Sequence, residues 1–191
     1  MKKMEIFLTD FFYINRLTTN RLMVPLNIGY IGAYAKKLFN KDVNITLFKD
    51  AGLMLEKLKS TKPDIVGMSF YYWNTNLNYY VVNKIRELYN KDVIIAYGGP
   101  SIDNIQEEHE RLFNRFPEVD LFIQGEGELG FSKLIERALS YPNEKIFDQS
   151  IECSFFNRSD EYVSGLNTTH TLALQEIPSP YLNGSLDEFL A

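Results

Sequence analysis

Residues 63–74, with the sequence PDIVGMSFYYWN, constrain the fold more than any other stretch of the chain. Their apolar residues Ile65, Val66, Met68 and Phe70 form a run that is too short for a helix and is typical of a strand buried on both faces. Aromatic residues continue to position 73, beyond the expected end of that strand. Because open parallel sheets bind ligands beyond the carboxyl ends of their strands, the stretch predicts a central parallel strand that leads into a binding site.

The rest of the chain alternates between two hydrophobic periodicities. Short apolar runs typical of strands occupy residues 4–8, 43–48, 65–70, 93–97 and 121–123. Between and after them, apolar residues recur every three or four positions, as on the buried face of a helix. The clearest helical stripe follows Pro25, a residue that suits a first helical turn. This alternation predicts an α/β fold with a doubly wound, five-stranded parallel sheet of flavodoxin-like (Rossmann-like) order.

The pattern changes after Tyr141. Ile151, Cys153 and Phe155 alternate with polar residues, and the Tyr162 region can supply the returning strand of a small β-hairpin. Residues 177–181, IPSPY, are typical of an extended linker. We therefore predict a flavodoxin-like domain over residues 1–141 and a small hairpin with a linker over residues 142–191.

Composition excludes several classes of protein. The net charge of −5 provides no positive field for nucleic acid. No apolar run approaches the ~18 residues that span a membrane, and Asp10 interrupts the apolar N-terminal stretch, so we expect a cytoplasmic protein without a membrane partner. The single cysteine, Cys153, excludes an internal disulfide and any three-cysteine metal or iron–sulfur motif within this chain, and it fits best as a core residue.

Unusual residues gather in the loops that follow the predicted strands. Ser69 and the aromatic residues 70–73 follow the third strand, residues 98–101 (GGPS) follow the fourth, and residues 125–128 (GEGE) follow the fifth. In a parallel sheet these loops share one edge. Glycines there let a large flat ligand approach the backbone, and aromatic side chains can pack on its faces. The alternative is that the glycines only form tight turns and the aromatic residues close the core.

Other ligand classes fit these loops less well. Gly125, Gly127 and Gly130 have the spacing of a dinucleotide-binding motif, but that motif belongs after a first strand, and the neighbouring glutamates would repel a pyrophosphate. The two glutamates instead suit the dipole of a following helix. A phosphorylated receiver domain would need an aspartate in place of Ser69. A flavodoxin would need a glycine-containing phosphate loop, whereas residues 17–20 are LTTN.

Three further polar residues have ordinary explanations. His109 lies between two glutamates on a predicted solvated helix face, and His170 lies among threonines, so both are expected to be surface histidines. Asp50 follows the second strand and could hydrogen-bond a ligand hydroxyl, although a turn-forming role is commoner.

Five short motifs, taken in order, resemble a known family. They are PLNIGYIGAY at residues 25–34, PDIVGMS at 63–69, GGP at 98–100, GEGE at 125–128 and IPSPY at 177–181. Together they resemble the N-terminal cobalamin-binding domain of cobalamin-dependent radical S-adenosylmethionine (SAM) enzymes, a group that includes methyltransferases and the anaerobic magnesium-protoporphyrin ester cyclase. The resemblance covers nearly the whole chain.

The resemblance implies a cobalamin-binding fold in which the corrin ring lies across the carboxyl edge and the nucleotide tail descends toward the sheet. The residues implied to bind this cofactor lie in three loops: Ser69, Phe70, Tyr71, Tyr72, Trp73, Gly98, Gly99, Pro100, Ser101, Gly125, Glu126 and Gly127. Cobalamin mutases and methionine synthase carry a cobalt-ligating histidine after the first strand, but residues 10–25 contain none. The resemblance therefore implies no metal-ligating residue here, and an aromatic residue of 70–73 would cap the lower face of the ring instead.

In this family a radical SAM domain would begin soon after Pro180 with Cys-x-x-x-Cys-x-x-Cys, which holds a [4Fe-4S] cluster. The sequence ends before such a motif. We therefore expect a cobalamin-binding module of a radical SAM enzyme that acts with a C-terminal radical SAM domain of the same polypeptide. Methyl transfer or a related radical reaction is the activity implied for the full-length protein, and this chain alone would bind cobalamin without cleaving SAM.

Two other functions stay open. A stand-alone corrinoid carrier protein would share the fold, but the absence of a histidine after the first strand argues against it. A flavodoxin-like docking module without a cofactor would use the aromatic residues 70–73 as a partner surface instead.

Overall fold

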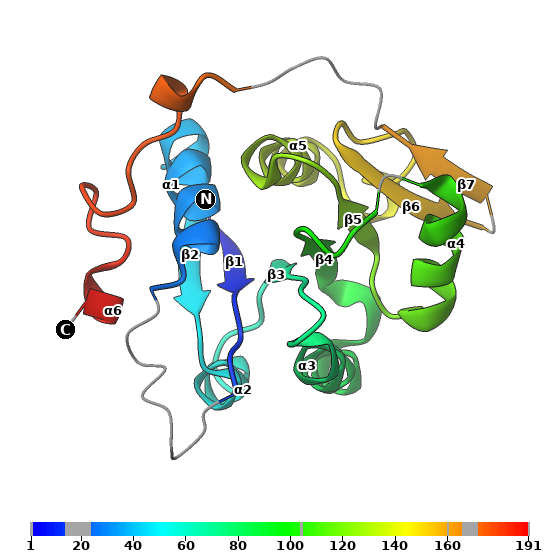
Figure 1. Ribbon diagram of the computed structural model, residues 1–191, viewed down its shortest axis with the longest axis horizontal. Coiled ribbons are helices and arrows are strands. Elements are labelled where there is room, and N and C mark those ends of the chain that lie inside the picture. Colours follow the sequence, from blue (N-terminus) through cyan, green and yellow to red (C-terminus); the bar gives the residue numbers. More distant parts are fainter. Residues whose placement is uncertain (1, 14–23, 104, 160, 166–171, 191) are drawn as a thin grey trace.

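The computed structural model describes residues 2–13, 24–103, 105–159, 161–165 and 172–190, and its centre is one seven-stranded sheet of order β2-β1-β3-β4-β5-β6-β7 (Figure 1). The first five strands pair in parallel, and the last two are antiparallel. The strands are β1 (Met4–Thr9), β2 (Val43–Phe48), β3 (Ile65–Ser69), β4 (Ile94–Gly98), β5 (Leu121–Ile123), β6 (Ser154–Arg158) and β7 (Glu161–Ser164).

Helices connect and cover these strands. Over the described residues, the α-helices are α1 (Leu26–Phe39), α2 (Ala51–Leu58), α3 (Thr75–Tyr89), α4 (Gln106–Arg115), α5 (Gly127–Ser140) and α6 (Asp187–Leu190), and the short 3-10 helices are η2 (Asn90–Asp92), η3 (Asn143–Lys145) and η4 (Leu174–Glu176). The predicted α/β fold and the parallel order 2-1-3-4-5 are thus confirmed. In the part of the chain that the structure describes, none of the helices combines the length and apolarity needed to cross a membrane.

The sheet is larger than the predicted five strands, because the two strands of the predicted hairpin, β6 and β7, join it and bring the number to seven. The β6–β7 pair is not a separate unit: Phe122 of β5 pairs with Phe155 of β6, which extends the sheet. The two rings stack with their centroids 5.4 Å apart, and both are fully buried. Since β5 has only three residues and would otherwise present an open edge, the added strands cover that edge and complete the core.

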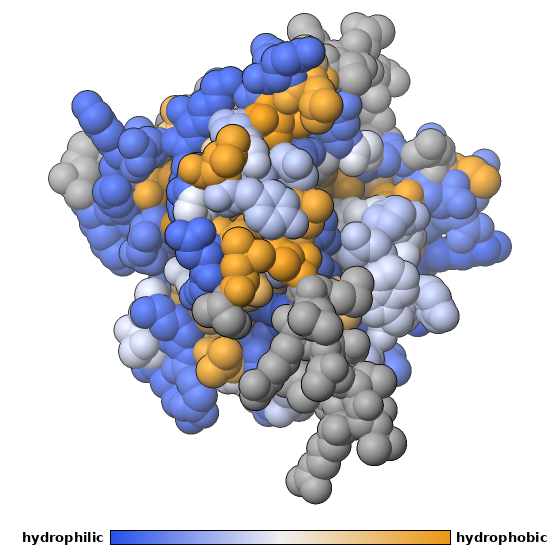
Figure 2. All heavy atoms as spheres, turned by 60° about the vertical axis from the view of Figure 1, so that its left-hand side comes forward, coloured by the Kyte–Doolittle hydropathy of each residue, from blue (hydrophilic) through white to orange (hydrophobic). Residues whose placement is uncertain are grey.

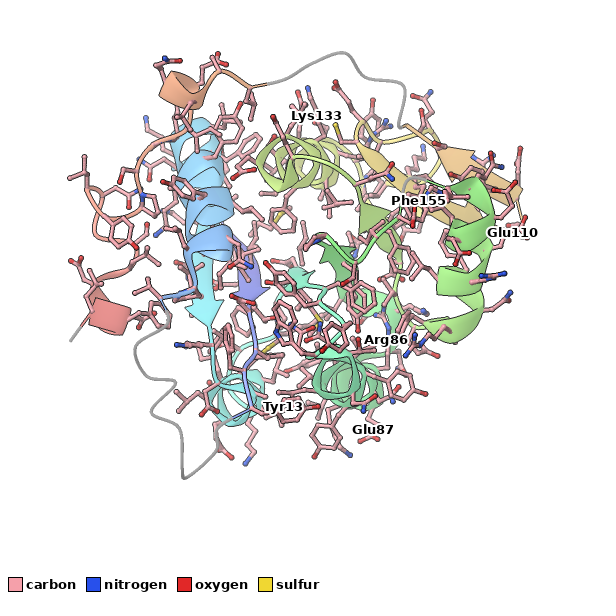
Figure 3. The ribbon with its side chains drawn as sticks, in the orientation of Figure 1. Tyr13, Arg86, Glu87, Glu110, Lys133 and Phe155 are labelled. Atoms are coloured by element: carbon pink, nitrogen blue, oxygen red, sulfur yellow. The ribbon has the colours of Figure 1, made fainter. Side chains whose placement is uncertain are left out.

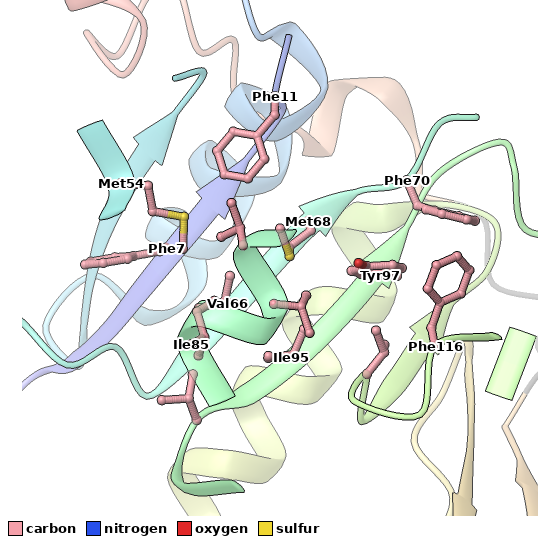
Figure 4. Close-up of a cluster of buried hydrophobic side chains, with 14 of the residues drawn as sticks. Phe7, Phe11, Met54, Val66, Met68, Phe70, Ile85, Ile95, Tyr97 and Phe116 are labelled. Carbon is pink, nitrogen blue, oxygen red and sulfur yellow. The ribbon is translucent and has the colours of Figure 1, made fainter. Parts of the chain in front are cut away.

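Two apolar layers enclose the sheet, one on each face. Successive residues of β1 show the alternation: Phe7 packs in one layer, and Ile6 and Leu8 pack in the other. Helices α2, α3 and α4 contribute to the first layer, which Figure 4 shows in close-up, and α1 and α5 contribute to the second. Since both faces are covered, the sheet can meet a ligand only at its edges and strand ends.

His109 is not the surface histidine that the sequence predicted, because only 1% of it is exposed. Its ring stacks on Phe155 with centroids 3.7 Å apart. Its Nδ1 lies 2.8 Å from the Tyr162 hydroxyl, and its Nε2 lies 2.9 Å from the Asp103 carbonyl oxygen. The prediction failed because the hairpin strands, distant in sequence, cover this face of α4. His170 lies outside the described residues.

Two other single-residue predictions are confirmed. Asp50 caps the N-terminus of α2, where its carboxylate accepts a hydrogen bond from the Leu53 backbone N–H at 3.0 Å. Cys153 is buried.

The C-terminal segment, residues 172–190, lies along α1 (Figure 1). Its Leu186 is fully buried beside Gly29, where an added Cβ would lie 2.9 Å from Leu186 Cδ2. The Lys37 ammonium also donates to the Glu176 carbonyl oxygen at 2.6 Å. Figure 2 shows apolar residues among polar ones on this side of the molecule. The segment is thus packed onto the second apolar layer.

Candidate functional site

A cavity of ≈ 370 Å³ opens at the carboxyl ends of β3, β4 and β5. Its base contains Gly67, Ala96 and Ile123, which belong to those three strands. Ile28 of α1 and Phe131 of α5 contribute apolar walls. The cavity therefore lies where parallel sheets bind ligands, and its interior is mostly apolar.

Seven of the twelve predicted site residues line this cavity, and they come from all three predicted loops: Ser69, Tyr71, Gly98, Gly99, Pro100, Gly125 and Gly127. The loop predictions thus converge on one place. The other five residues, Phe70, Tyr72, Trp73, Ser101 and Glu126, do not line it.

The aromatic residues of the third loop point in different directions. Phe70 is buried in the opposite apolar layer, where it stacks on Tyr97 with centroids 5.1 Å apart. Tyr71 faces the cavity and stacks on Trp73 with centroids 4.3 Å apart. Tyr72 is 82% exposed. Because side chains alternate along an extended backbone, Phe70 lies on the other face from Ser69 and Tyr71.

Three glycines that line the cavity, Gly67, Gly98 and Gly99, have different structural roles. A Cβ on Gly67 would lie 2.6 Å from the Phe131 ring, so this glycine lets α5 pack on β3. Gly99 has φ +135°, and its Cβ would lie 2.9 Å from the Phe70 carbonyl oxygen, so its backbone excludes a side chain. At Gly98 the nearest atom to an added Cβ is 3.6 Å away, which is ordinary contact. The fold therefore has room for a side chain at Gly98, and its absence keeps the cavity open.

A hydrogen-bonded group of polar side chains borders the cavity on the β1 and β3 side. Ser69 Oγ donates to the Thr9 carbonyl oxygen at 3.0 Å and accepts from Asn27 Nδ2 at 3.0 Å. The same Asn27 nitrogen donates to the Tyr71 hydroxyl at 3.2 Å. Asn27 of α1 therefore holds the two cavity-lining hydroxyls of Ser69 and Tyr71 in place through direct hydrogen bonds.

Two buried asparagines hold the turn between β3 and α3. Asn74 Nδ2 and Asn78 Nδ2 both donate to the Ser69 carbonyl oxygen, at 3.0 and 2.8 Å. Asn74 Oδ1 accepts from the Tyr71 backbone N–H at 3.0 Å. This arrangement satisfies the backbone where the strand ends, so Ser69 and Tyr71 keep their orientation toward the cavity.

Several polar residues that organise the site were not predicted from the sequence, namely Asn27, Asn74, Asn78, Gln124 and Glu128. One signal was present: Asn27 belongs to the apolar stripe of α1, where an amide on the sheet side needs a partner. The asparagines of α3 gave no comparable signal, because asparagine at a helix start is common.

Two carboxyl groups at this edge have perturbed pKa values. Burial raises the pKa of the Asp10 carboxyl, while hydrogen bonds from Ser69 and Asn27 and the nearby Lys49 ammonium oppose that rise. Burial also raises the pKa of the Glu128 carboxyl, which lines the cavity, and the charge of Glu126 adds to the effect. Such perturbations are common at ligand-binding sites.

Metal-binding side chains do not cluster at this edge. Among the described residues, no three or more histidine, cysteine, aspartate or glutamate side chains are grouped so that they could hold a metal ion. The polar groups around the cavity are mainly amides and hydroxyls, which suit hydrogen bonding to an organic ligand.

Comparison with known proteins supports the resemblance that was expected from the sequence. No family model matches the chain. It is 30% identical over 131 residues to the cobalamin-dependent radical SAM methyltransferase TokK of Streptomyces tokunonensis, an alignment that covers 68% of this chain and 18% of TokK. It is 28% identical over 174 residues to 2-(S-pantetheinyl)-carbapenam-3-carboxylate methyltransferase of Streptantibioticus cattleyicolor, which covers 88% of this chain and 24% of that enzyme.

A solved structure shares the fold over nearly the whole chain. It is the cobalamin-dependent S-adenosylmethionine radical enzyme OxsB with aqua-cobalamin and S-adenosylmethionine bound, with a TM-score of 0.69, 20% identity and coverage of 98% of this chain and 26% of OxsB. This chain thus spans about a quarter or less of the length of the enzymes it matches. The resemblance expected from the sequence is confirmed: the chain is a homologue of the N-terminal part of the cobalamin-dependent radical SAM methyltransferases.

Proposed function

We propose that this chain is a cobalamin-binding module and that the cavity at the carboxyl edge receives part of the cofactor. Gly98 carries this proposal most directly. It lines the cavity, and an added Cβ would clash with nothing in the protein. Packing of the fold therefore does not require a glycine at this position, whereas an open cavity does. The homologues with cobalamin in their names supply the class of ligand.

The cavity suits one part of cobalamin, the aromatic base of the nucleotide tail. A flat heteroaromatic base needs apolar walls and a few polar groups, which Ile28, Phe131, Asn27 and Ser69 provide. The corrin ring is larger than this cavity and would lie over its mouth. There the stacked rings of Tyr71 and Trp73 provide a flat aromatic surface.

Residues of this chain would then act by positioning and shielding. Asn27 and Ser69 would orient the tail base through their hydrogen-bonded network, and the apolar walls would exclude water. The asparagines of α3 would hold the third loop against the ring. When bound, cobalamin supplies a cobalt centre that can carry a methyl group.

The activity of a longer protein is a further part of this proposal. By analogy with its homologues, we propose methyl transfer that uses S-adenosylmethionine and a [4Fe-4S] cluster, with a radical SAM domain on the same polypeptide. We also propose that the chain divides into two parts near residue 141 and that the protein is cytoplasmic. The similarity of this chain to a limited part of larger enzymes supports the domain partner.

The test is an absorption spectrum of the purified protein after incubation with hydroxocobalamin and desalting. We expect close to one equivalent of corrinoid to stay with the protein. Gly98→Val should abolish retention while the far-ultraviolet circular dichroism stays unchanged, because its side chain fills cavity space without a clash at Cβ. Ser60→Val, which adds an apolar side chain at an exposed position outside the cavity, should retain corrinoid like the parent protein.

A colourless parent protein would contradict the proposal and favour a docking module. Equal retention by the Gly98→Val variant would place the corrinoid elsewhere on the molecule. Gly99→Val is a poor test, because the backbone at this residue excludes a side chain and the variant would be strained whether or not it binds.

A further inference from the structure

Glu128 gives the cavity an unusual charge distribution. The lining contains apolar groups, glycines and neutral amides and hydroxyls, and Glu128 is its single carboxylate, with no lysine or arginine, among the described residues. A lone carboxylate on the wall of a mostly apolar cavity costs solvation free energy.

Packing of α5 against α1 brings Glu128 to the cavity. A Cβ on Gly127 would lie 2.9 Å from Ile31 Cδ1, so the glycine allows the first turn of α5 to approach α1. Glu128 is the next residue and faces the space between these helices and the sheet. Its position is thus fixed by backbone packing.

No cation among the described residues balances the charge. Across the described ranges, Glu128 forms no ion pair, and its carboxylate accepts a hydrogen bond only from its own backbone N–H. Lys133, one turn further along α5, is paired with Glu136 at 3.1 Å and lies 3.9 Å from Glu152. The nearest carboxylate in sequence, Glu126, has a separate role, since it accepts from the Leu172 backbone N–H at 3.0 Å. Glu128 is therefore left to interact with whatever enters the cavity.

The two amide side chains that line the cavity, Asn27 and Gln124, already donate hydrogen bonds within the protein. Asn27 donates to Ser69 and Tyr71 and accepts from the Ile28 backbone N–H at 2.8 Å. Gln124 donates to the Asp103 carbonyl oxygen at 2.7 Å. The cavity thus presents a strong hydrogen-bond acceptor to its ligand, and the ligand group that suits it is a neutral N–H or O–H donor.

We propose that Glu128 makes the site selective for corrinoids whose side chains are carboxamides over corrinoids that carry a free carboxylate. This inference rests on the proposed function and specifies its ligand. A carboxamide N–H can donate to Glu128, whereas a carboxylate in the same place brings two negative charges together in a poorly solvated space. The phosphodiester of the nucleotide tail must then lie away from Glu128, toward the open mouth of the cavity.

The test compares hydroxocobalamin with its three monocarboxylic acids, in each of which one propionamide has been hydrolysed. All four ligands share the phosphodiester, so the comparison isolates the added carboxylate. Affinities are measured by absorption titration at pH 8, well above the ordinary pKa of both carboxyl groups. We expect the parent protein to bind at least one acid about tenfold or more weakly than hydroxocobalamin, a ratio of the size that one poor charge contact produces.

Two variants test whether Glu128 causes this selectivity. Glu128→Gln removes the charge and keeps the shape, so it should bind the disfavoured acid more tightly and reduce the ratio to below about threefold. Glu126→Gln is the matched control: it neutralises the neighbouring carboxylate, which does not line the cavity, and should keep the parent ratio.

Each outcome separates this inference from the proposed function. Equal affinity of the parent protein for all four corrinoids, or an unchanged ratio in Glu128→Gln, overturns the role of Glu128 and leaves cobalamin binding standing. Failure of the parent protein to bind hydroxocobalamin overturns both.

Discussion

The two edges of the sheet are built differently. At the amino edge, side chains cap the strand ends: Asp64 accepts from the Glu5 backbone N–H at 2.7 Å, and Asp120 accepts from the Ile95 backbone N–H at 2.7 Å. Arg86, of which 9% is exposed, donates to the Val93 and Glu118 carbonyl oxygens and to Asp120. Figure 3 labels Arg86 on α3 below the strands.

At the carboxyl edge, by contrast, β3, β4 and β5 end around the cavity, and β4 ends in a glycine, Gly98. Among the described residues, the buried Thr9 hydroxyl and Oδ1 of the buried Asp10 carboxyl have no hydrogen-bond partner there, and Glu128 forms no ion pair. The difference indicates that stability and ligand binding are assigned to opposite ends of the same strands. Substitutions at the two edges should therefore have separable effects.

The largest expected effect is at the amino edge. Arg86→Met removes the donors to the carbonyl oxygens of Asn90, Val93 and Glu118 and leaves Asp120, which is mostly buried, without its closest cation. Loss of a buried charge partner of this kind costs about 3–4 kcal/mol. Urea unfolding at pH 7 should show this loss, and the remaining folded protein should bind hydroxocobalamin as the parent does.

Arg111→Met is the matched control for this prediction. Arg111 pairs with Glu108 on an exposed face of α4, and such pairs contribute less than about 0.5 kcal/mol. A loss below about 1 kcal/mol in Arg86→Met would contradict the structural role assigned to the amino edge.

The fold was predictable from sequence because its main signals are local. Buried strands such as residues 65–69 have no polar positions until they end, and the helices between them show a clear apolar stripe. The strand order then follows from short right-handed connections. The attachment of β6 to β5 was not predictable, because the pairing of Phe122 with Phe155 joins residues far apart in the sequence.

The loops that form the site were predictable from the sequence, but the individual residues that line the cavity were not. All three loops converge, yet Phe70 and Ser69 could not both face one cavity, because neighbours in a strand point to opposite faces. Applying this alternation would have removed Phe70 from the predicted site. The roles of Asn27 and Glu128 depend on how closely α1 and α5 approach, which the sequence pattern alone does not determine.

An intermediate effect is expected where the carboxyl edge meets the hairpin. The Asp103 carbonyl can only accept, so His109 Nε2 donates to it and Nδ1 accepts from the Tyr162 hydroxyl. His109→Phe keeps the stack on Phe155 and loses both hydrogen bonds, which should cost about 1–2 kcal/mol in urea unfolding.

Glu110→Gln, at the next and exposed position of α4, should change stability by less than about 0.5 kcal/mol. A neutral result for His109→Phe would mean that the carboxyl edge gains no stability from this contact, which would sharpen the contrast between the edges. A loss as large as that of Arg86→Met would contradict that contrast.

The smallest effect is expected at Asp10, and its sign distinguishes the edges. Burial raises the pKa of this carboxyl, so its contribution to stability is fully present below its ordinary pKa of 3.8 and is lost as the pH rises through the higher folded value. Asp10→Asn should therefore stabilise the protein by about 1 kcal/mol at pH 7.5, and the gain should shrink toward pH 4.5. Urea unfolding at both pH values measures this difference.

An aspartate-to-asparagine substitution at the amino edge should change the stability in the opposite direction. Asp64 uses its carboxylate to accept from a strand backbone N–H, so Asp64→Asn weakens a charge-assisted hydrogen bond and should lower stability by up to about 1 kcal/mol at pH 7.5. If Asp10→Asn also lowered stability at that pH, attraction between the Asp10 carboxylate and Lys49 would outweigh burial. The carboxyl edge would then be stabilised by its charges in the same way as the amino edge, and the two ends of the sheet would differ in shape alone.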